Sequence, residues 1–174
     1  MFASKHPFST GDRRVIPVQT LGMSTTAKGD VAEQAVVLAL MAAGKTVLKP
    51  ISNGLRYDLA IDNLDGSFTR VQVKTGMLKR GGSVLAFRAY NADARRPGGV
   101  SYQGQVDAFG VYCPWDGRMF FVPMAAIGTI TSEVSLRLAP ARNGQRQGIR
   151  AAESYVLESE RRTGFEPATP TLAR

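Results

Sequence analysis

The 174-residue sequence predicts one α/β domain, on two main observations. Segment 25–43 has the interior AEQAVVLALMAA, rich in strong helix formers and followed by Gly44, which predicts an α-helix. Segments 55–62 and 69–75 alternate around Asp65-Gly66, which predicts a β-hairpin. The chain is long enough for one domain with a real core.

Glu33 stands on the apolar face of the predicted helix, among residues at helical spacing. Those residues are Val36, Val37, Leu40 and Met41. We expect this face to be buried, and a carboxylate at its edge costs free energy unless it has a partner. The alternative is local, because Asp30-x-x-Glu33 resembles a capping box in which Glu33 only satisfies the helix start. The sequence leaves a functional role and capping equally open.

The predicted hairpin has an apolar face and a polar face, because strand side chains alternate with period two. The apolar face is expected to carry Leu55, Tyr57, Leu59 and Ile61 with Val71, Val73 and Thr75. The polar face is expected to carry Arg56, Asp58 and Asp62 with Arg70, Gln72 and Lys74. Residues opposite each other on paired strands lie about 4.5–5.5 Å apart. A register with Asp58 near Gln72 and Lys74 would therefore bring a carboxylate, an amide oxygen and an ammonium together.

This polar set is chemically suited to hydrolysing a phosphodiester. Mg²⁺ takes oxygen ligands, commonly one or two carboxylates with phosphate and water. A neighbouring lysine suits a phosphate or the activation of water. The simpler alternative is a surface hairpin with a solvated face, and alternation and charge alone favour that alternative.

Composition excludes several classes of protein. The one cysteine, Cys113, excludes an internal disulfide framework and fits a reducing, cytoplasmic compartment. Together with the one histidine, His6, it also excludes a Cys/His zinc site, and a Ser-His-Asp triad is not expected. Segment 1–20 lacks the apolar core of a signal peptide. No apolar run approaches the roughly 18 residues that span a bilayer, so no membrane partner is expected.

The net charge of +8 favours a polyanionic partner, most often nucleic acid. Segment 70–100 carries seven basic residues against one acid, and segment 137–150 carries four basic residues and no acid. Ordinary solubilising charge explains such clusters equally well.

The remaining segments are assigned in chain order. Segments 46–48, 83–90, 106–113, 118–122 and 133–138 are predicted strands, and segments 123–127 and 149–158 are predicted helices. Segment 77–83 is predicted to be a basic turn. Segment 91–105 is predicted to be a long loop whose Arg, Tyr and Gly residues suit contact with a phosphate backbone and base stacking. Asp107 is interpreted as a turn residue in preference to a site group.

Taken together, these residues resemble the PD-(D/E)XK nuclease superfamily over about residues 27–157. The matching pieces, in order, are Lys28-Gly29-Asp30 with Glu33, Arg56-Tyr57-Asp58, Gln72-Val73-Lys74 and the segment VYCPWDGRMFFVP. Two departures stand out, since Tyr57 replaces the proline before the first aspartate and Gln72 replaces the second acid. The glutamine is similar to the pattern of the group I intron homing endonuclease branch, so the chain looks most like that branch.

The resemblance implies a restriction-endonuclease-like core, with a mixed central β-sheet flanked by helices. It implies that Asp58 is the central metal ligand and that Gln72, the carbonyl of Val73 and Glu33 contribute further oxygens. Lys74 would orient or deprotonate the attacking water. Because an amide replaces a carboxylate, we expect weaker metal affinity than in a fully acidic site.

The resulting expectation is a Mg²⁺-dependent DNA endonuclease, homing-like, with Mn²⁺ as a substitute. The alternatives are a Holliday junction resolvase or restriction-type nuclease, or a catalytically decayed DNA-binding module. Double-stranded DNA is the expected partner, and a symmetric target implies a homodimer or higher homo-oligomer. The nuclease domain is predicted over 23–158, between disordered segments 1–22 and 159–174. The expected DNA-binding residues are Lys28, Lys79, Arg80, Arg88, Arg95, Arg96 and Tyr102.

Overall fold

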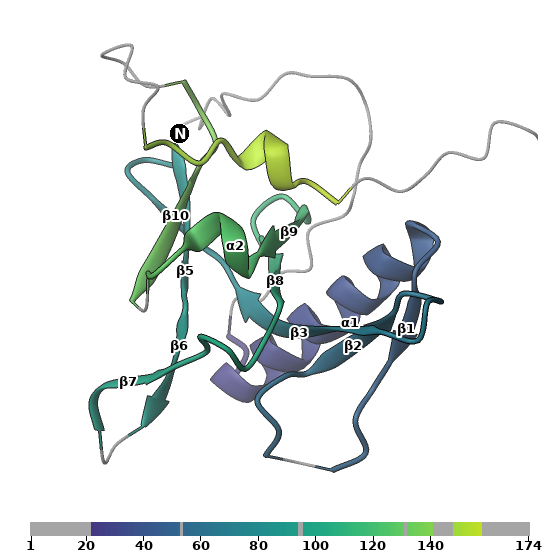
Figure 1. Cartoon of the computed structure of the whole chain (residues 1–174). Coiled ribbons are helices and arrows are strands. Elements are labelled where there is room, and N and C mark those ends of the chain that lie inside the picture. Colours follow the sequence, from purple (N-terminus) through teal and green to yellow (C-terminus); the bar gives the residue numbers. More distant parts are fainter. Residues whose placement is uncertain (1–21, 53, 94–95, 131, 141–147, 158–174) are drawn as a thin grey trace, which may run out of the picture.

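The computed structural model of the protein describes residues 22–52, 54–93, 96–130, 132–140 and 148–157. Its elements are α1 (Thr25–Ala42), β1 (Thr46–Leu48), β2 (Leu59–Asp62), β3 (Phe68–Thr75), β4 (Met77–Lys79), β5 (Val84–Arg88), β6 (Tyr90–Asp93), β7 (Arg96–Ser101), β8 (Ala108–Tyr112), β9 (Met119–Pro123), α2 (Met124–Ile127), β10 (Glu133–Arg137) and a 3₁₀ turn, η1 (Ala152–Tyr155). Figure 1 shows α1 beside strands β1, β2 and β3, away from β5 and β10. The predicted terminal segments lie outside the described residues, apart from Gly22.

The central sheet has five strands in the order β1-β2-β3-β8-β9. Strands β3 and β8 run parallel, and the other neighbouring pairs are antiparallel. A second sheet has the order β10-β5-β4, and β6 pairs with β7 as a separate hairpin. The predicted α/β class with a mixed central sheet and helices is therefore confirmed.

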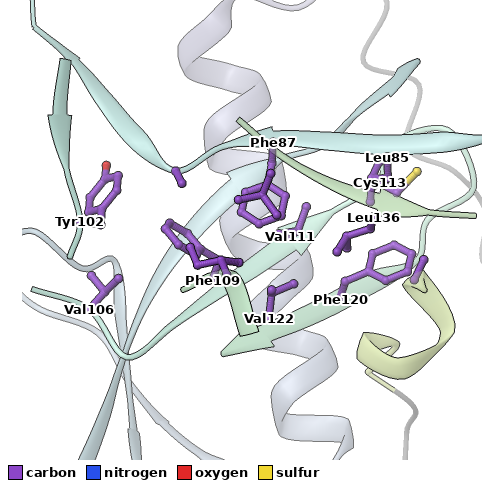
Figure 2. Close-up of a cluster of buried hydrophobic side chains, with 14 residues drawn as sticks. Leu85, Phe87, Tyr102, Val106, Phe109, Val111, Cys113, Phe120, Val122 and Leu136 are labelled. Carbon is purple, nitrogen blue, oxygen red and sulfur yellow. The ribbon is translucent and has the colours of Figure 1, made fainter. Parts of the chain in front are cut away.

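Two apolar clusters cover the two faces of the central sheet. On one face, Ala32, Val36 and Leu40 of α1 pack against Leu59, Ile61, Val71 and Val73. On the other face, Phe109, Val111, Phe120 and Val122 pack against residues of β5 and β10, including Phe87 and Leu136. Figure 2 shows this second cluster, with the aromatic rings of Phe87 and Phe109 close together; their centroids are 5.3 Å apart.

Helix α1 lies very close to strand β8. A Cβ atom built on Gly110 would fall 2.6 Å from Cγ1 of Val36, a separation that real contacts do not show. Gly110 therefore lets the helix approach the sheet. The predicted helix is confirmed, but its buried face is centred on Ala32, Val36 and Leu40, while Met41 is 60% exposed.

The β2–β3 hairpin has the predicted register around Asp65-Gly66, where Gly66 takes a φ of 86°. Leu59 and Ile61 are buried against α1 as expected. The prediction was wrong for Leu55 and Tyr57, because β2 begins only at Leu59. Outside the strand the alternation does not hold, so Leu55 is exposed and Tyr57 packs against the other cluster.

Segments 77–83 and 91–105 contain strands where a turn and a long loop were predicted. Residues 77–79 form β4, which pairs with β5. Strands β6 and β7 form a hairpin with an irregularity between Asn91 and Asp93, and Figure 1 shows it extending away from the central sheet. A Cβ on Gly99 would lie 2.4 Å from the Tyr90 ring, so the glycine that indicated a loop is required by close pairing.

The predicted helix 149–158 was also wrong. Only Ala152–Tyr155 form a single 3₁₀ turn. Ala151 forms a bridge to Arg137 and Val156 forms a bridge to Phe120, so both flanks are extended. Pairing with two sheets overrides the local helix propensity of this segment. Within the described residues, no helix is long and apolar enough to cross a membrane.

Candidate active site

The β2–β3 register brings Asp58 beside Gln72. Leu59 pairs with Val71, and the N–H of Asp58, one residue earlier, donates to the Val71 carbonyl at 3.0 Å. The Val73 N–H donates to Asp58 Oδ2 at 2.7 Å, and the Gln72 side-chain amide donates to the same oxygen. The carboxylate is thereby fixed against β3.

Gln72 is a buried polar side chain, with 8% of its surface exposed. Its Nε2 also lies 3.4 Å from the Val73 carbonyl oxygen. The positive end of the amide thus occupies the space between two oxygens, one from Asp58 and one from Val73. Rotating the amide by 180° would exchange its nitrogen and oxygen with little change in shape.

Lys74 lies on the same face of β3 as Gln72, and together with Asp58 these residues form the cluster of the candidate site. Its Nζ donates to the Tyr102 hydroxyl at 3.0 Å. Burial lowers the pKa of Lys74 to about 8, with Arg56 and Arg88 adding to the fall and Asp58 opposing it. Burial raises the pKa of Asp58, although the Val73 N–H and Lys74 favour its ionised form. The charges of Asp58 and Lys74 are therefore partly desolvated and mutually supporting.

Glu33 approaches this cluster from α1, where its carboxylate contributes to the raised pKa of Asp58. Glu33 also forms an ion pair with Lys49 at 2.5 Å, and 23% of its side chain is exposed. The capping interpretation was wrong, because the helix begins at Thr25 and Ser24 caps it by accepting from the Ala27 N–H at 3.2 Å.

The donor set of the cluster fits a hard divalent cation. Asp58 offers a carboxylate, Gln72 an amide oxygen after rotation, and Val73 a main-chain carbonyl, all ligands that suit Mg²⁺. The amide nitrogen already lies where two oxygens converge, which is a position that attracts positive charge. Within the described ranges, no three His, Cys, Asp or Glu residues gather as a metal site. Any cation held here would therefore rely on neutral oxygens beside one or two carboxylates.

Arg56 was not selected from the sequence as a site residue, yet it lies at this cluster. It donates to the main-chain carbonyls of Val100 at 3.3 Å and Ser101 at 3.0 Å, and to the Gln105 side chain. Its guanidinium carbon is 4.6 Å from the centre of the Tyr102 ring. The sequence did offer one signal, since Arg56 and Asp58 share the predicted polar face.

The predicted DNA-binding residues lie in different environments. Tyr102 is 4% exposed, so base stacking by this ring is contradicted. Lys79 forms an ion pair with Glu133 at 2.6 Å, whereas Arg80 and Arg88 are exposed and Lys28 is half-buried on α1. Arg95 lies outside the described residues, and Arg96 is described only as backbone of β7.

Asp107 is not part of the cluster. It accepts hydrogen bonds from the Arg70 side chain at 2.9 and 3.0 Å and from the Arg70 N–H at 2.8 Å. It therefore ties the bend before β8 to β3, consistent with a structural role. A cavity of about 350 Å³ is lined partly by Leu40, Ile61 and Phe121. Its lining does not include Glu33, Asp58, Gln72 or Lys74.

Comparisons with known proteins agree with the resemblance found in the sequence. Residues 23–158 match the family model described as PD-(D/E)XK endonuclease. The structure is similar to that of a bacterial homing endonuclease, I-Ssp6803I, with 26% sequence identity and a TM-score of 0.56. That alignment covers 76% of this chain and 86% of the other. No curated protein sequence gives a significant match.

Proposed function

The chain belongs to the PD-(D/E)XK endonuclease family, and from this premise we propose that it is a Mg²⁺-dependent, homing-type endonuclease that cleaves double-stranded DNA. The observation that carries the proposal is the contact of Asp58 with Gln72 and Val73 beside Lys74. The similarity to a bacterial homing endonuclease supports the homing type. We further propose that residues 23–158 form the nuclease domain and that a symmetric target is cut by a homodimer or higher homo-oligomer.

Each side chain has a defined part in the proposed reaction. Asp58, the Gln72 amide oxygen and the Val73 carbonyl would hold Mg²⁺ or Mn²⁺, with Glu33 contributing once released from Lys49. The bound cation would supply a Lewis acid and a source of activated water. Lys74, on the same strand, orients the attacking water and stabilises negative charge on the phosphate as it develops.

Basic residues on the surface would attract the negatively charged DNA. The net charge of +8 and the exposed Arg80 and Arg88 favour binding to a phosphate backbone. Lys28, Arg95 and Arg96 remain proposed contacts. Lys79 is a weaker candidate, because Glu133 already neutralises its charge.

Plasmid cleavage tests this function directly. Purified protein is incubated with supercoiled plasmid in Mg²⁺, Mn²⁺, Ca²⁺ or EDTA, and nicked and linear products are measured. We expect cleavage in Mg²⁺ and Mn²⁺ and none in EDTA. Lys74→Ala should abolish cleavage while DNA binding in Ca²⁺ persists, and Lys45→Ala, at an exposed lysine, is the matched control.

Other outcomes would point to the alternative functions. Faster cleavage of a four-way junction than of linear duplex would make the protein a junction resolvase. Binding without nicking in any metal would make it a DNA-binding module with a decayed site. Full cleavage by Lys74→Ala would contradict the assigned role of that lysine.

A further inference from the structure

Tyr102 lies between the apolar core and the candidate active site. Its ring meets Phe109 edge to face, with centroids 5.7 Å apart and an interplanar angle of 85°. Figure 2 shows Tyr102 at one end of the buried cluster, apart from the residues around Phe87. Its hydroxyl lies 3.0 Å from Lys74 Nζ. A ring fixed by the core thus carries a polar atom to the ammonium.

Arg56 forms hydrogen bonds to residues on both sides of Tyr102 in the chain. It binds the carbonyls of Val100 and Ser101 on one side of Tyr102 and the side chain of Gln105 on the other. Its guanidinium also lies over the ring. These three acceptors are neutral, so the hydrogen bonds that Arg56 makes to them orient its charge without cancelling it.

A lysine at a reacting centre needs such an anchor. Its side chain is long and flexible, with about 2 kcal/mol of rotamer entropy, and a misplacement of about 1 Å can cost about 100-fold in rate. In the described part of the chain, Lys74 Nζ donates a hydrogen bond to the Tyr102 hydroxyl, which can serve as that anchor. The ammonium also lies 4.6 Å from the centre of that ring.

We propose that Tyr102 is a positioning residue that holds Lys74 for the reaction, and that Arg56 fixes Tyr102 by binding residues on both sides of it. This inference rests on the proposed nuclease function. Because Val100 and Ser101 end β7, Arg56 also connects the base of the β6–β7 hairpin to Lys74.

The first test is Tyr102→Phe, which removes only the hydroxyl and leaves the ring against Phe109. We expect the single-turnover cleavage rate at saturating protein to fall about 10- to 100-fold. The dissociation constant for DNA in Ca²⁺ should stay within about twofold of the wild-type value, because the buried hydroxyl contacts no substrate. Tyr155→Phe, at another tyrosine packed on the same cluster, is the matched control and should change neither quantity.

The second test is Arg56→Lys, which keeps the positive charge but cannot span the same acceptors. We expect a similar fall in rate with unchanged DNA affinity. Combining Arg56→Lys with Tyr102→Phe should cost little more than either change alone, because both act through one ammonium. Arg56→Lys also serves as the deciding variant should Tyr102→Phe lower the melting temperature.

The outcomes separate this proposal from the function on which it rests. Wild-type cleavage rates in Tyr102→Phe would overturn the positioning role and leave the nuclease function intact. A loss of DNA affinity equal to the loss of rate would also overturn it, since Tyr102 would then be a substrate contact. A wild-type protein that never cleaves DNA would overturn the proposed function, and the positioning role with it.

Discussion

Strand β3 has two different faces. One packs against helix α1, and the other carries Gln72 and Lys74, which contact Asp58 and Tyr102. Val73 and Gln72 are adjacent and equally exposed, at 8% each. Val73 packs among the side chains of α1 and β2, while Gln72 donates to the Asp58 carboxylate. Burial therefore does not separate the two faces. They differ in what the buried atoms contact, and only the polar face positions groups that can react.

The largest effect is expected from a substitution that removes a charge from the polar face without changing the shape of the side chain. Asp58→Asn should lower the cleavage rate about 1,000-fold or more, equivalent to about 4 kcal/mol in the barrier, because the cation loses its central carboxylate. Single-turnover assays in Mg²⁺ measure this loss. Asp62→Asn is the control and should cleave normally, because Asp62 is the last residue of β2 and its carboxylate accepts from the Leu64 N–H.

A change on the apolar face should affect stability instead of chemistry. Leu40→Ala should lower the free energy of unfolding by about 3 kcal/mol, because Leu40 is 1% exposed between α1 and the sheet. Leu38→Ala, on the same helix but 70% exposed, should cost less than about 0.5 kcal/mol. Urea unfolding compares the two variants. Equal losses would show that α1 does not pack through the Leu40 face.

Gln72→Glu sharpens the contrast by adding charge to the polar face. A second carboxylate beside Asp58 should strengthen Ca²⁺ binding about tenfold, since a unit charge at 4 Å contributes about 1–4 kcal/mol depending on solvent access. Titration calorimetry measures the change. Gln34→Glu adds the same charge on the exposed side of α1 and should leave Ca²⁺ affinity unaltered. An unchanged affinity in Gln72→Glu would contradict a cation site here.

The smallest effect concerns Arg70, which precedes Gln72 and Lys74 on the polar face but binds Asp107. Hydrogen bonds from Arg70 hold the pKa of Asp107 below its usual value of 3.8. The ion pair therefore stabilises the fold above about pH 4, and this contribution is lost as the pH falls through the lowered pKa. Asp107→Asn should cost about 0.2–1 kcal/mol at pH 7.

Urea unfolding of Asp107→Asn and wild type at pH 7 and pH 2 tests this dependence. The difference between the two proteins should shrink at the lower pH, because Asp107 loses its charge as the pH falls through its lowered pKa. Asp30→Asn, at an exposed acid on α1, is the control. A difference that stays constant with pH would assign the loss to something other than the ion pair.

Local sequence patterns predicted the parts of the fold that repeat with a fixed period. Alternation in β3 correctly placed Val71 and Val73 on one face and brought Gln72 beside Asp58. Helix formers and Gly44 correctly marked the extent of α1 to within a residue. In each case the signal lies within a few neighbouring residues.

The features that the sequence did not predict depend on distant partners. Arg56 binds residues 44 to 49 positions later in the chain, and no local period relates them. Tyr102 was predicted to contact DNA from the long loop 91–105, but its ring packs on Phe109 in the core and is buried. Hydrogen bonding across β6 and β7 likewise overrode a composition typical of loops.

Gly110 has a consequence beyond the packing of Val36. Glu33 stands one turn before Val36 on α1, so the gap between helix and sheet also sets how far the Glu33 carboxylate extends toward Asp58. Gly110→Ala would place a methyl group against Val36, so the helix would have to move away from the sheet and Glu33 would move with it. The position of the Glu33 carboxylate on α1 thus depends on the absence of a Cβ atom at Gly110 on β8.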